Sequence, residues 1–126
     1  MAKYIQVTAN LQLTENGTAI TGEAASKSDA QADSAGKFAR NILVTSSSAT
    51  AIPMGSVTVA AGTTYAWVEI KNVDSTDSVD VYMDAGTHGV GRIPPGQTWG
   101  PCYVDFIPYV KRVANTPTIW VTAIQA

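Results

Sequence analysis

Alternation of apolar and polar residues runs through most of this chain, and it is clearest between residues 64 and 100. Successive side chains of a β-strand point to opposite faces, so the segment 66–71 (AWVEIK) predicts a strand with one apolar face. The segment 79–84 (VDVYMD) repeats the pattern, and the intervening residues 72–78 are rich in Asp, Ser and Thr, which favour turns. The stretch therefore predicts an antiparallel hairpin with one apolar and one polar face. Its inward-facing residues would be Ala66, Val68, Ile70, Val79, Val81 and Met83.

Residues 4–13 also alternate, and the pair Asn16-Gly17 follows them. Both residues of an Asn-Gly pair tolerate positive φ, which makes the pair a strong signal for a two-residue hairpin turn. Residues 19–21 would then form a short return strand.

The segment 23–37 (EAASKSDAQADSAGK) differs from its surroundings because it is polar and has no sustained apolar stripe. Such a segment has little to bury. Its alanines come near helical spacing, which leaves a helix open, but we expect a long exposed loop. Long loops in compact domains are commonly functional or mobile. We interpret this one as an arm that becomes ordered on a neighbouring subunit.

Further strands are predicted at 38–45, 56–60, 90–93, 102–113 and 118–124, with Pro108 marking a sheet edge or a bulge. Many short strands separated by regular turn signals are typical of an all-β fold. The sequence predicts one domain over residues 1–126, an antiparallel β-sandwich of jelly-roll-like type with 23–37 as an exposed loop or arm.

Three short motifs carry a resemblance: EIKNVD at 69–74, VDVY at 79–82 and RIPPGQ at 92–97, followed by the apolar closing strand 118–124. Together they resemble small structural proteins of tailed-bacteriophage virions. The resemblance implies a non-enzymatic capsid decoration (cement) protein that binds the major capsid protein and forms homo-oligomers, with a trimer favoured. A head–tail connector, a tail subunit or a fibre subunit is the alternative within this class.

Composition and charge narrow the range of partners. Charged residues make up 14 % of the chain, against about 25 % in a typical domain, which fits a surface partly covered by a partner or simply a Thr-rich β domain. The net charge is −2 and the one adjacent basic pair is Lys111-Arg112, so we expect no nucleic-acid partner.

Targeting signals are not evident in the sequence. No apolar run approaches the roughly 20 residues that span a bilayer, and the N-terminal residues lack the apolar segment of a signal peptide. We therefore expect no membrane partner, synthesis in a bacterial cytoplasm and a final location on the capsid surface of a virion.

Candidate chemistry is sparse. His88 is the one histidine and Cys102 the one cysteine, so neither a multi-histidine metal site nor an intramolecular disulfide is possible within one chain. The glycines of 86–91 precede Ile93-Pro94-Pro95, which excludes the helix that a phosphate-binding loop needs. We expect no enzyme activity, metal or cofactor. A spaced acidic series is interpreted as a solvated face rather than a calcium site, and comprises Asp74, Asp77, Asp80 and Asp84.

Aromatic residues at outward strand positions are the strongest candidates for binding, because such residues are enriched at interfaces. Trp67 stands out, since the alternation places it opposite the core residues. A carbohydrate- or receptor-binding β-sandwich with a cleft lined by Trp67, Tyr82 or Trp99 is the second alternative. The candidate interface residues are Tyr4, Ile5, Trp67, Tyr82, Arg92 and Trp99.

Overall fold

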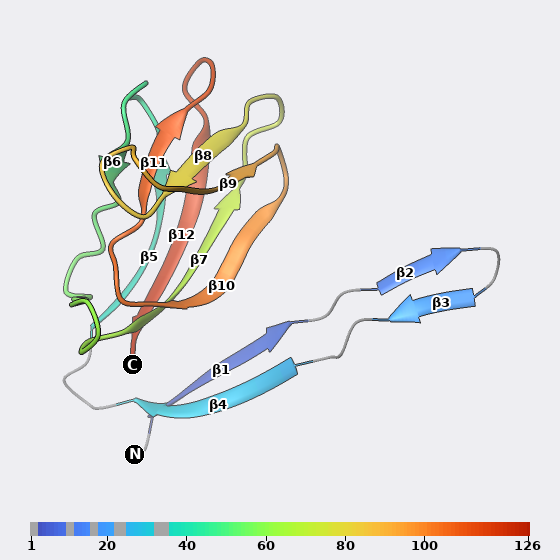
Figure 1. The fold of residues 1–126 in the computed structure, drawn as a ribbon, viewed down its shortest axis with the longest axis vertical. Helices are drawn as coiled ribbons and strands as arrows, with labels where there is room; N and C mark the ends of the chain where they lie inside the picture. The colour runs from blue at the N-terminus through green and yellow to red at the C-terminus, as the bar shows by residue number, and fades with distance from the viewer. Residues whose placement is uncertain (1–2, 10–11, 16–17, 22–24, 32–35) are drawn as a thin grey trace.

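A two-layered β-sandwich with a projecting arm makes up the chain (Figure 1). The computed structural model describes residues 3–9, 12–15, 18–21, 25–31 and 36–126. All regular structure in these ranges is β-strand. The strands are β1 (Lys3–Ala9), β2 (Gln12–Glu15), β3 (Thr18–Thr21), β4 (Ala25–Gln31), β5 (Lys37–Leu43), β6 (Thr50–Ala51), β7 (Ala66–Asn72), β8 (Val79–Tyr82), β9 (Gly89–Ile93), β10 (Thr98–Val104), β11 (Tyr109–Arg112) and β12 (Thr118–Gln125).

Two antiparallel sheets form the sandwich over residues 36–126. Sheet I has the strand order β10-β7-β12-β5 and sheet II has the order β6-β11-β8-β9. From β5 to β12 the chain changes sheet at every step except between β8 and β9, which are neighbours in sheet II. This is the connectivity of an eight-stranded jelly roll. The fold-class prediction is confirmed.

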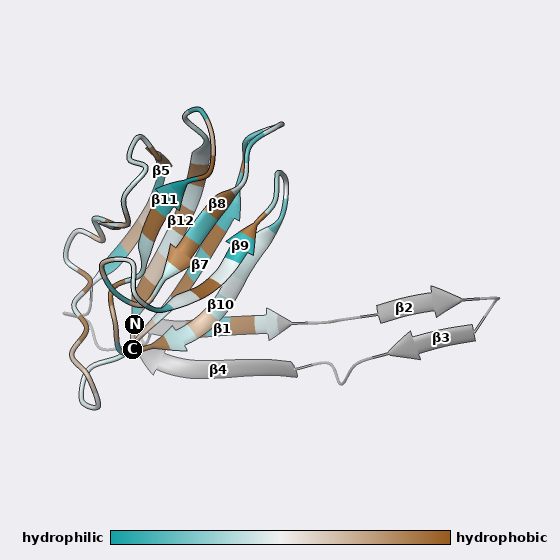
Figure 2. Cartoon of the chain, turned by 45° about the horizontal axis from the view of Figure 1, so that its top comes forward, coloured by the Kyte–Doolittle hydropathy of each residue, from teal (hydrophilic) through white to brown (hydrophobic). Residues whose placement is uncertain are grey.

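The core lies between the facing sides of the two sheets. Apolar residues alternate with more polar ones along β7, β8 and β12 (Figure 2), and the apolar set points inward. Full burial of one valine or isoleucine side chain contributes about 1.5–3 kcal/mol. The most completely buried valine and isoleucine side chains of the core are Val68, Ile70, Val79, Val81, Ile93, Ile119 and Val121.

The expected hairpin between 66–71 and 79–84 is wrong. Both segments are strands, but β7 pairs with β10 and β12 in sheet I, whereas β8 pairs with β9 and β11 in sheet II. The chain crosses from one layer to the other, so the apolar sides of the two strands face each other instead of lying side by side. Met83 is half-exposed because β8 ends at Tyr82, before Met83 can join the core.

A buried asparagine fixes this crossing. Asn72, the last residue of β7, is 0 % exposed. Its side-chain amide donates to the carbonyl oxygens of Asp77 at 2.7 Å and Ile93 at 2.9 Å, and its Oδ1 accepts from the Asp74 amide at 3.0 Å. Asp77 belongs to the crossing turn and Ile93 to β9, so one side chain of sheet I holds both the turn and sheet II. A buried amide with these partners avoids the desolvation penalty of an unpaired polar group.

The predicted strand 102–113 is divided between the two sheets. Its first part belongs to β10 in sheet I, and its second part is β11 in sheet II. Pro108 lies in the crossing connection, is buried, and accepts a hydrogen bond on its carbonyl from the Ile52 amide at 2.9 Å. β10 ends at Val104 and β11 begins directly after Pro108, where a residue without an N–H costs no ladder hydrogen bond.

The predicted strand 56–60 is absent from the described structure of that region. Ala60 makes an isolated bridge to Thr64, and the Val57 amide bonds to the Met54 carbonyl in a turn. The edge of sheet II is instead formed by β6 at Thr50–Ala51. Hydrogen bonds within turns at both ends of 56–60 use backbone groups that a strand would need for pairing.

A bulge in β10 changes which side chains face the core. Trp99 pairs with Ile70 and Cys102 pairs with Val68, so β10 holds one residue more than β7 between these pairs. Trp99 consequently points inward, whereas Tyr103, paired with Trp67, points outward. Gly100 occupies the bulge with φ of +90°, and a Cβ there would lie 2.5 Å from the Val68 carbonyl oxygen. The bulge therefore requires glycine at this position.

The arm contains strand where a loop was expected. Over 23–37 the prediction was an exposed loop, but β4 (Ala25–Gln31) pairs with β1 along its whole length, from Lys3↔Gln31 to Ala9↔Ala25. Ladder hydrogen bonds join backbone groups, so a polar strand can form without the apolar stripe that sequence reasoning requires. Beyond this ribbon, β2 and β3 pair from Gln12↔Thr21 to Glu15↔Thr18, as the hairpin prediction implies. The turn pair Asn16-Gly17 itself lies outside the described residues.

We expect Asn72→Ala to lower the free energy of unfolding by about 3 kcal/mol, because it removes the buried amide and leaves carbonyl and amide groups without their partner. Urea denaturation followed by tryptophan fluorescence measures the change. The matched control is Asn41→Ala, since Asn41 is exposed on a strand of the same sheet. Equal midpoints for the two variants would show that Asn72 does not hold the crossing.

We expect Gly100→Ala to cost about 2 kcal/mol more than Gly96→Ala. Both glycines have positive φ, but an added Cβ meets backbone at Gly100 and open space at Gly96. The difference between the two variants therefore isolates the steric overlap from the cost of the backbone conformation. Thermal unfolding of both proteins gives the comparison, and similar melting temperatures would refute the steric account.

Candidate interaction surface

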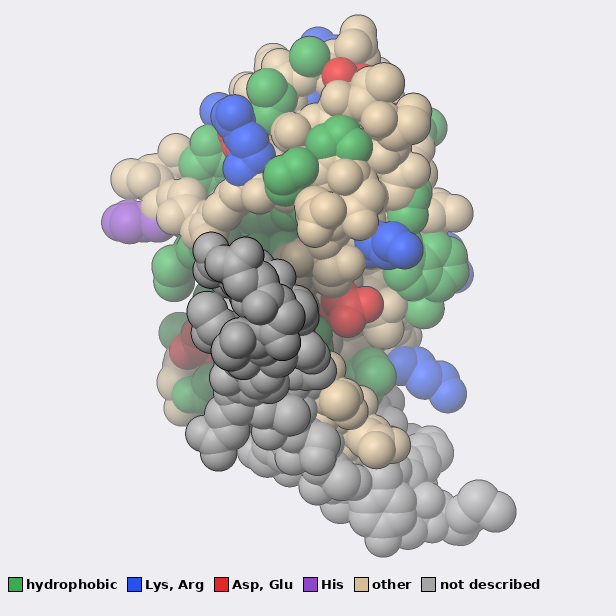
Figure 3. Space-filling view, turned by 90° about the vertical axis from the view of Figure 1, so that its right-hand side faces the viewer, with side chains coloured by type: hydrophobic (Ala, Val, Ile, Leu, Met, Phe, Trp, Pro, Cys, Tyr) green, Lys and Arg blue, Asp and Glu red, His purple; other side chains and the backbone are tan. Residues whose placement is uncertain are grey.

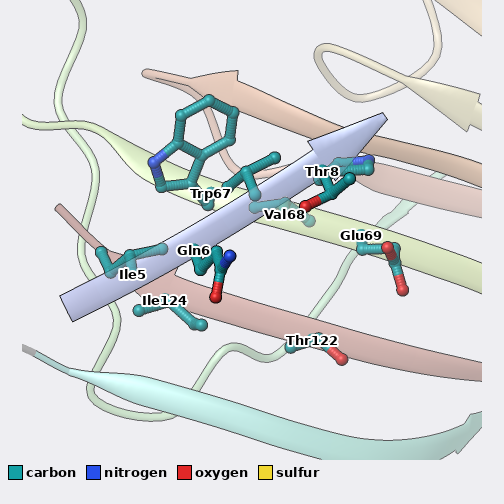
Figure 4. Close-up of a pocket in the computed structure, with 10 residues that line it drawn as sticks. Ile5, Gln6, Thr8, Trp67, Val68, Glu69, Thr122 and Ile124 are labelled. Atoms are coloured by element: carbon teal, nitrogen blue, oxygen red, sulfur yellow. The ribbon is translucent and has the colours of Figure 1, made fainter. Parts of the chain in front are cut away.

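The root of the arm rests on the outer face of sheet I. Alternation along β7 and β12, and their pairing, place Trp67 beside Ile124 and Glu69 beside Thr122 on that face. Strand β1 passes over them, and Ile5 is only 3 % exposed (Figure 4). We call Trp67, Pro101, Thr122 and Ile124 the arm seat, because they line one cavity together with Ile5 and Val7 of β1.

Packing at the arm seat is loose. A cavity of about 150 Å³ remains between β1 and the sheet, and polar side chains such as Gln6, Thr8 and Glu69 also line it. Burial of one isoleucine contributes about 1.5–3 kcal/mol, whereas ordering a backbone costs about 1–2 kcal/mol for each residue. The Ile5 contact can therefore anchor the base of the arm, but it cannot by itself order the rest of β1–β4.

Hydrogen bonds also hold the point where the arm joins the sandwich. The Gln125 amide donates to the Gly36 carbonyl at 2.9 Å, and the Gln125 side chain bonds Thr58 on both its amide nitrogen and its hydroxyl. Gly36 is buried, and a Cβ there would lie 2.4 Å from the Ser56 carbonyl oxygen. The end of the arm is thus fixed by close backbone packing at Gly36.

An aromatic cluster adjoins the arm seat on the same face of sheet I. Tyr65 and Tyr103 stack with ring centroids 4.8 Å apart, and Trp67 meets Tyr103 at 4.9 Å with the rings tilted by 43°. Tyr103 remains 47 % exposed. Leu43 and Trp120 are further exposed apolar residues on this face, at the β5 side of the sheet. Apolar side chains on this face therefore alternate with polar ones, which include Asn41, Glu69, Lys71, Thr118 and Thr122.

Basic and acidic side chains are interspersed on the surface of the sandwich. Viewed from the side to which the arm extends, hydrophobic, basic and acidic side chains are interspersed on the described part of the sandwich (Figure 3). On the outer face of sheet II, Arg92 forms a two-pronged ion pair with Asp80 at 2.7 and 3.1 Å, which raises the pKa of Arg92. Lys111 lies over the Tyr82 ring, 5.3 Å from its centroid. The outer face of sheet II thus carries an ion pair and a cation–π contact, whereas that of sheet I carries the aromatic cluster and the arm seat.

The predicted interface residues are divided between three places. Ile5 and Trp67 meet at the arm seat. Tyr82 and Arg92 share the polar outer face of sheet II, away from that seat. Trp99 packs against the core, with its ring beside Gly91. Tyr4 pairs with Ala30 through the backbone, and its side chain lies outside the described part of the chain.

Sequence reasoning missed the residues that surround Trp67. Tyr65, Tyr103 and Ile124 come from three separate segments, and only the sheet pairing brings them together. Alternation along the closing strand could have placed Ile124 and Trp120 on one face. Tyr103 gave no such signal. The bulge at Gly100 shifts the alternation, so the residues before it and after it do not follow one pattern of inward and outward side chains.

A second cavity of about 180 Å³ opens at the edge of the sandwich between β5 and β6. Its apolar lining includes Ile42, Val44, Ile52 and Val110, and its lining holds no titratable side chain.

The loop after β8 holds the one histidine. Asp84 Oδ1 accepts from the backbone amides of Gly86, Thr87 and His88, and its Oδ2 lies 2.5 Å from His88 Nδ1. The hydrogen bond from His88 is the main cause that holds the pKa of Asp84 well below its usual range, with the backbone donors adding to it. Among the described residues the imidazole is paired with this carboxylate rather than with a serine or cysteine. The pair therefore organises a loop.

Two further kinds of reactive site to consider are a reactive thiol and a metal centre. Cys102 is half-buried, and burial raises the pKa of its thiol, which disfavours the thiolate. Within the described ranges, no group of three or more His, Cys, Asp or Glu side chains could hold a metal ion. In the same part of the chain, no helix has the length and apolar character to cross a membrane.

Comparisons with protein-family models, with curated proteins and with solved structures found no match to this chain.

We expect the Asp84 carboxyl to titrate well below its ordinary pKa, and His88→Ala to move that pKa upward, because the substitution removes the main cause of the shift. A lowered pKa in the folded state means that the contribution of Asp84 to stability is present above the ordinary value and is lost as the pH falls through the folded-state pKa. Carbon-detected NMR titration of the side-chain carboxyl measures both proteins. Identical titration curves would contradict the assignment.

Proposed function

We propose that this chain is a non-enzymatic structural protein of a tailed-bacteriophage particle, a decoration (cement) protein that binds the shell of major capsid protein. The observation that carries the proposal is the combination of a self-contained jelly roll with a long two-stranded arm that projects from one end of it. Jelly rolls serve in viral capsids and in lectins, so the fold alone does not select a function. The arm favours assembly.

The arm is suited to binding another protein. An isolated two-stranded ribbon is marginal in water and needs a further strand or a packed surface to become stable. The β1–β4 ribbon has two outer edges whose backbone groups can pair with a strand of a partner, as in β-augmentation. An arm of this kind gains its order where it meets a neighbouring subunit.

Stabilisation of a shell follows from selective binding. A protein that binds the assembled shell, and not the free capsid subunit, shifts the equilibrium toward assembly by mass action. The apolar surface of sheet I and the arm provide two contacts per copy, so a single copy can tie neighbouring subunits together.

A glycan-binding module is the second candidate, because one observation favours it. Tyr103 is half-exposed beside Trp67 and next to polar residues that include Glu69, and exposed aromatic rings with polar neighbours are suited to stacking on sugars. The rings of this cluster cover one another, however, since Tyr65 stacks on Tyr103. The free aromatic surface is therefore smaller than three rings would suggest.

Copy number in purified particles tests the proposal. We expect quantitative mass spectrometry to find this chain near a one-to-one ratio with the major capsid protein of the phage that encodes it. A handful of copies per particle would point instead to a connector, tail or fibre subunit. Absence from particles would remove the virion role, and a glycan-array screen with Trp67→Ala as the matched variant would then test the second candidate.

The heat resistance of particles that lack the protein provides an independent test. We expect particles that lack it to release their genome at a lower temperature, and added wild-type protein to restore the wild-type temperature. Protein with Ser75→Ala, a substitution at an exposed position in the turn after β7, serves as the control for folding and handling. Particles that lose no heat resistance without the protein would contradict a cement role.

A further inference from the structure

We propose that the arm of one copy lies on sheet I of a second copy of this chain, with β1 of the first copy in the arm seat of the second. The inference concerns contacts between copies and does not depend on the virion role. Within one chain, Ile5 and Val7 of β1 already meet Trp67, Thr122 and Ile124. Exchange between copies uses the same contacts, so the seat fits its occupant in either arrangement.

In a single copy, the described strands of the arm form two-stranded pairs. β1 pairs with β4 and β2 pairs with β3, and in the described structure neither ribbon belongs to a larger sheet. Most of the arm extends away from its own sandwich (Figure 1). Two-stranded ribbons need a third strand or a packed face, which a second copy can provide.

Exposed apolar side chains flank the arm seat on the same face. Tyr103 lies on one side of the seat, and Trp120 and Leu43 lie toward β5, with polar residues between them and the seat. Beneath β1 a cavity of about 150 Å³ remains, so the fit within one copy falls short of the close packing of a protein interior. A ribbon that approaches from a second copy is free to follow this surface, because its position is not fixed by the join at Gly36.

Exchange of the arm can satisfy every arm and every seat in a closed assembly. Two copies that exchange arms reciprocally form a dimer, and three or more copies that each pass an arm to the next copy form a ring.

Cysteine pairing distinguishes exchange from contact within one chain. In a Cys102→Ser background, we expect the Ile5→Cys, Ile124→Cys double variant of the full chain to form covalent oligomers under mild oxidation, visible on a non-reducing gel. A covalently closed monomer as the main product would overturn the proposal. Two single variants with different affinity tags, produced together in one cell, should give a mixed dimer that neither variant gives alone.

A control pair reports random collisions. Tyr82 lies on the outer face of sheet II, so Ile5→Cys with Tyr82→Cys should give neither product in appreciable yield. If this pair cross-links as well as the test pair, the oligomers are collisional and the proposal fails.

Mass measurement in solution covers the case in which the cysteine variants fold poorly. We expect the wild-type full chain to elute as an oligomer in size-exclusion chromatography with light scattering. A charge placed in the apolar seat by Ile124→Glu should weaken association at least about tenfold, which corresponds to about 1.4 kcal/mol. Val90→Glu, which places a charge at an exposed apolar position of sheet II, is the matched control. A monomeric wild type, or an oligomer unchanged by Ile124→Glu, would overturn the proposal.

Discussion

One buried amide determines how the chain passes between the two sheets. Asn72 ends β7 inside the core, where an unpaired polar group would cost several kcal/mol, so its partners must be in place when the protein folds. Those partners are the carbonyls of Asp77 in the turn and Ile93 in sheet II. The inward alternation of β8, the position of β9 and the facing of the two apolar layers all follow from this crossing. Buried polar groups of this kind specify one arrangement among several that would bury the same apolar area.

Local structure could be predicted from this sequence, but the assignment of strands to sheets could not. Alternation in 66–71 and 79–84 correctly indicated strands with one buried face. A hairpin and two strands that face each other across a core give the same alternation of apolar and polar residues, because each strand has one buried face in both arrangements. What separates these arrangements is the burial of Asn72, which looks in the sequence like any other turn residue. The split of 102–113 into β10 and β11 was hidden in the same way, with Pro108 as the one local sign.

The candidate surface shows where residue-by-residue reasoning stops. Ile5 and Trp67 were both named from the sequence, and the structure places them at one seat. Simple alternation places Trp99 and Tyr103 on one face, but the extra residue at the bulge separates them, so that Trp99 points toward the core and Tyr103 points outward. The sequence sign of this change is Gly100, but a glycine alone does not tell a bulge from a turn. Strand β4 was missed because its polar residues carry no alternation, although its backbone pairs as fully as that of β1.

The contrast between sandwich and arm links the fold to its use. The sandwich buries two apolar layers against each other and satisfies its polar crossing internally, so it needs nothing from outside. The arm has a ladder of hydrogen bonds but, apart from Ile5 and Val7 at its root, no described contact with a second layer. Hydrogen bonds to water compete with such a ladder, and burial is what makes strand pairing favourable. A two-stranded extension whose described packing on the sandwich lies at its root gains stability from any further surface that covers it, and this is the physical reason for proposing that the arm meets a partner.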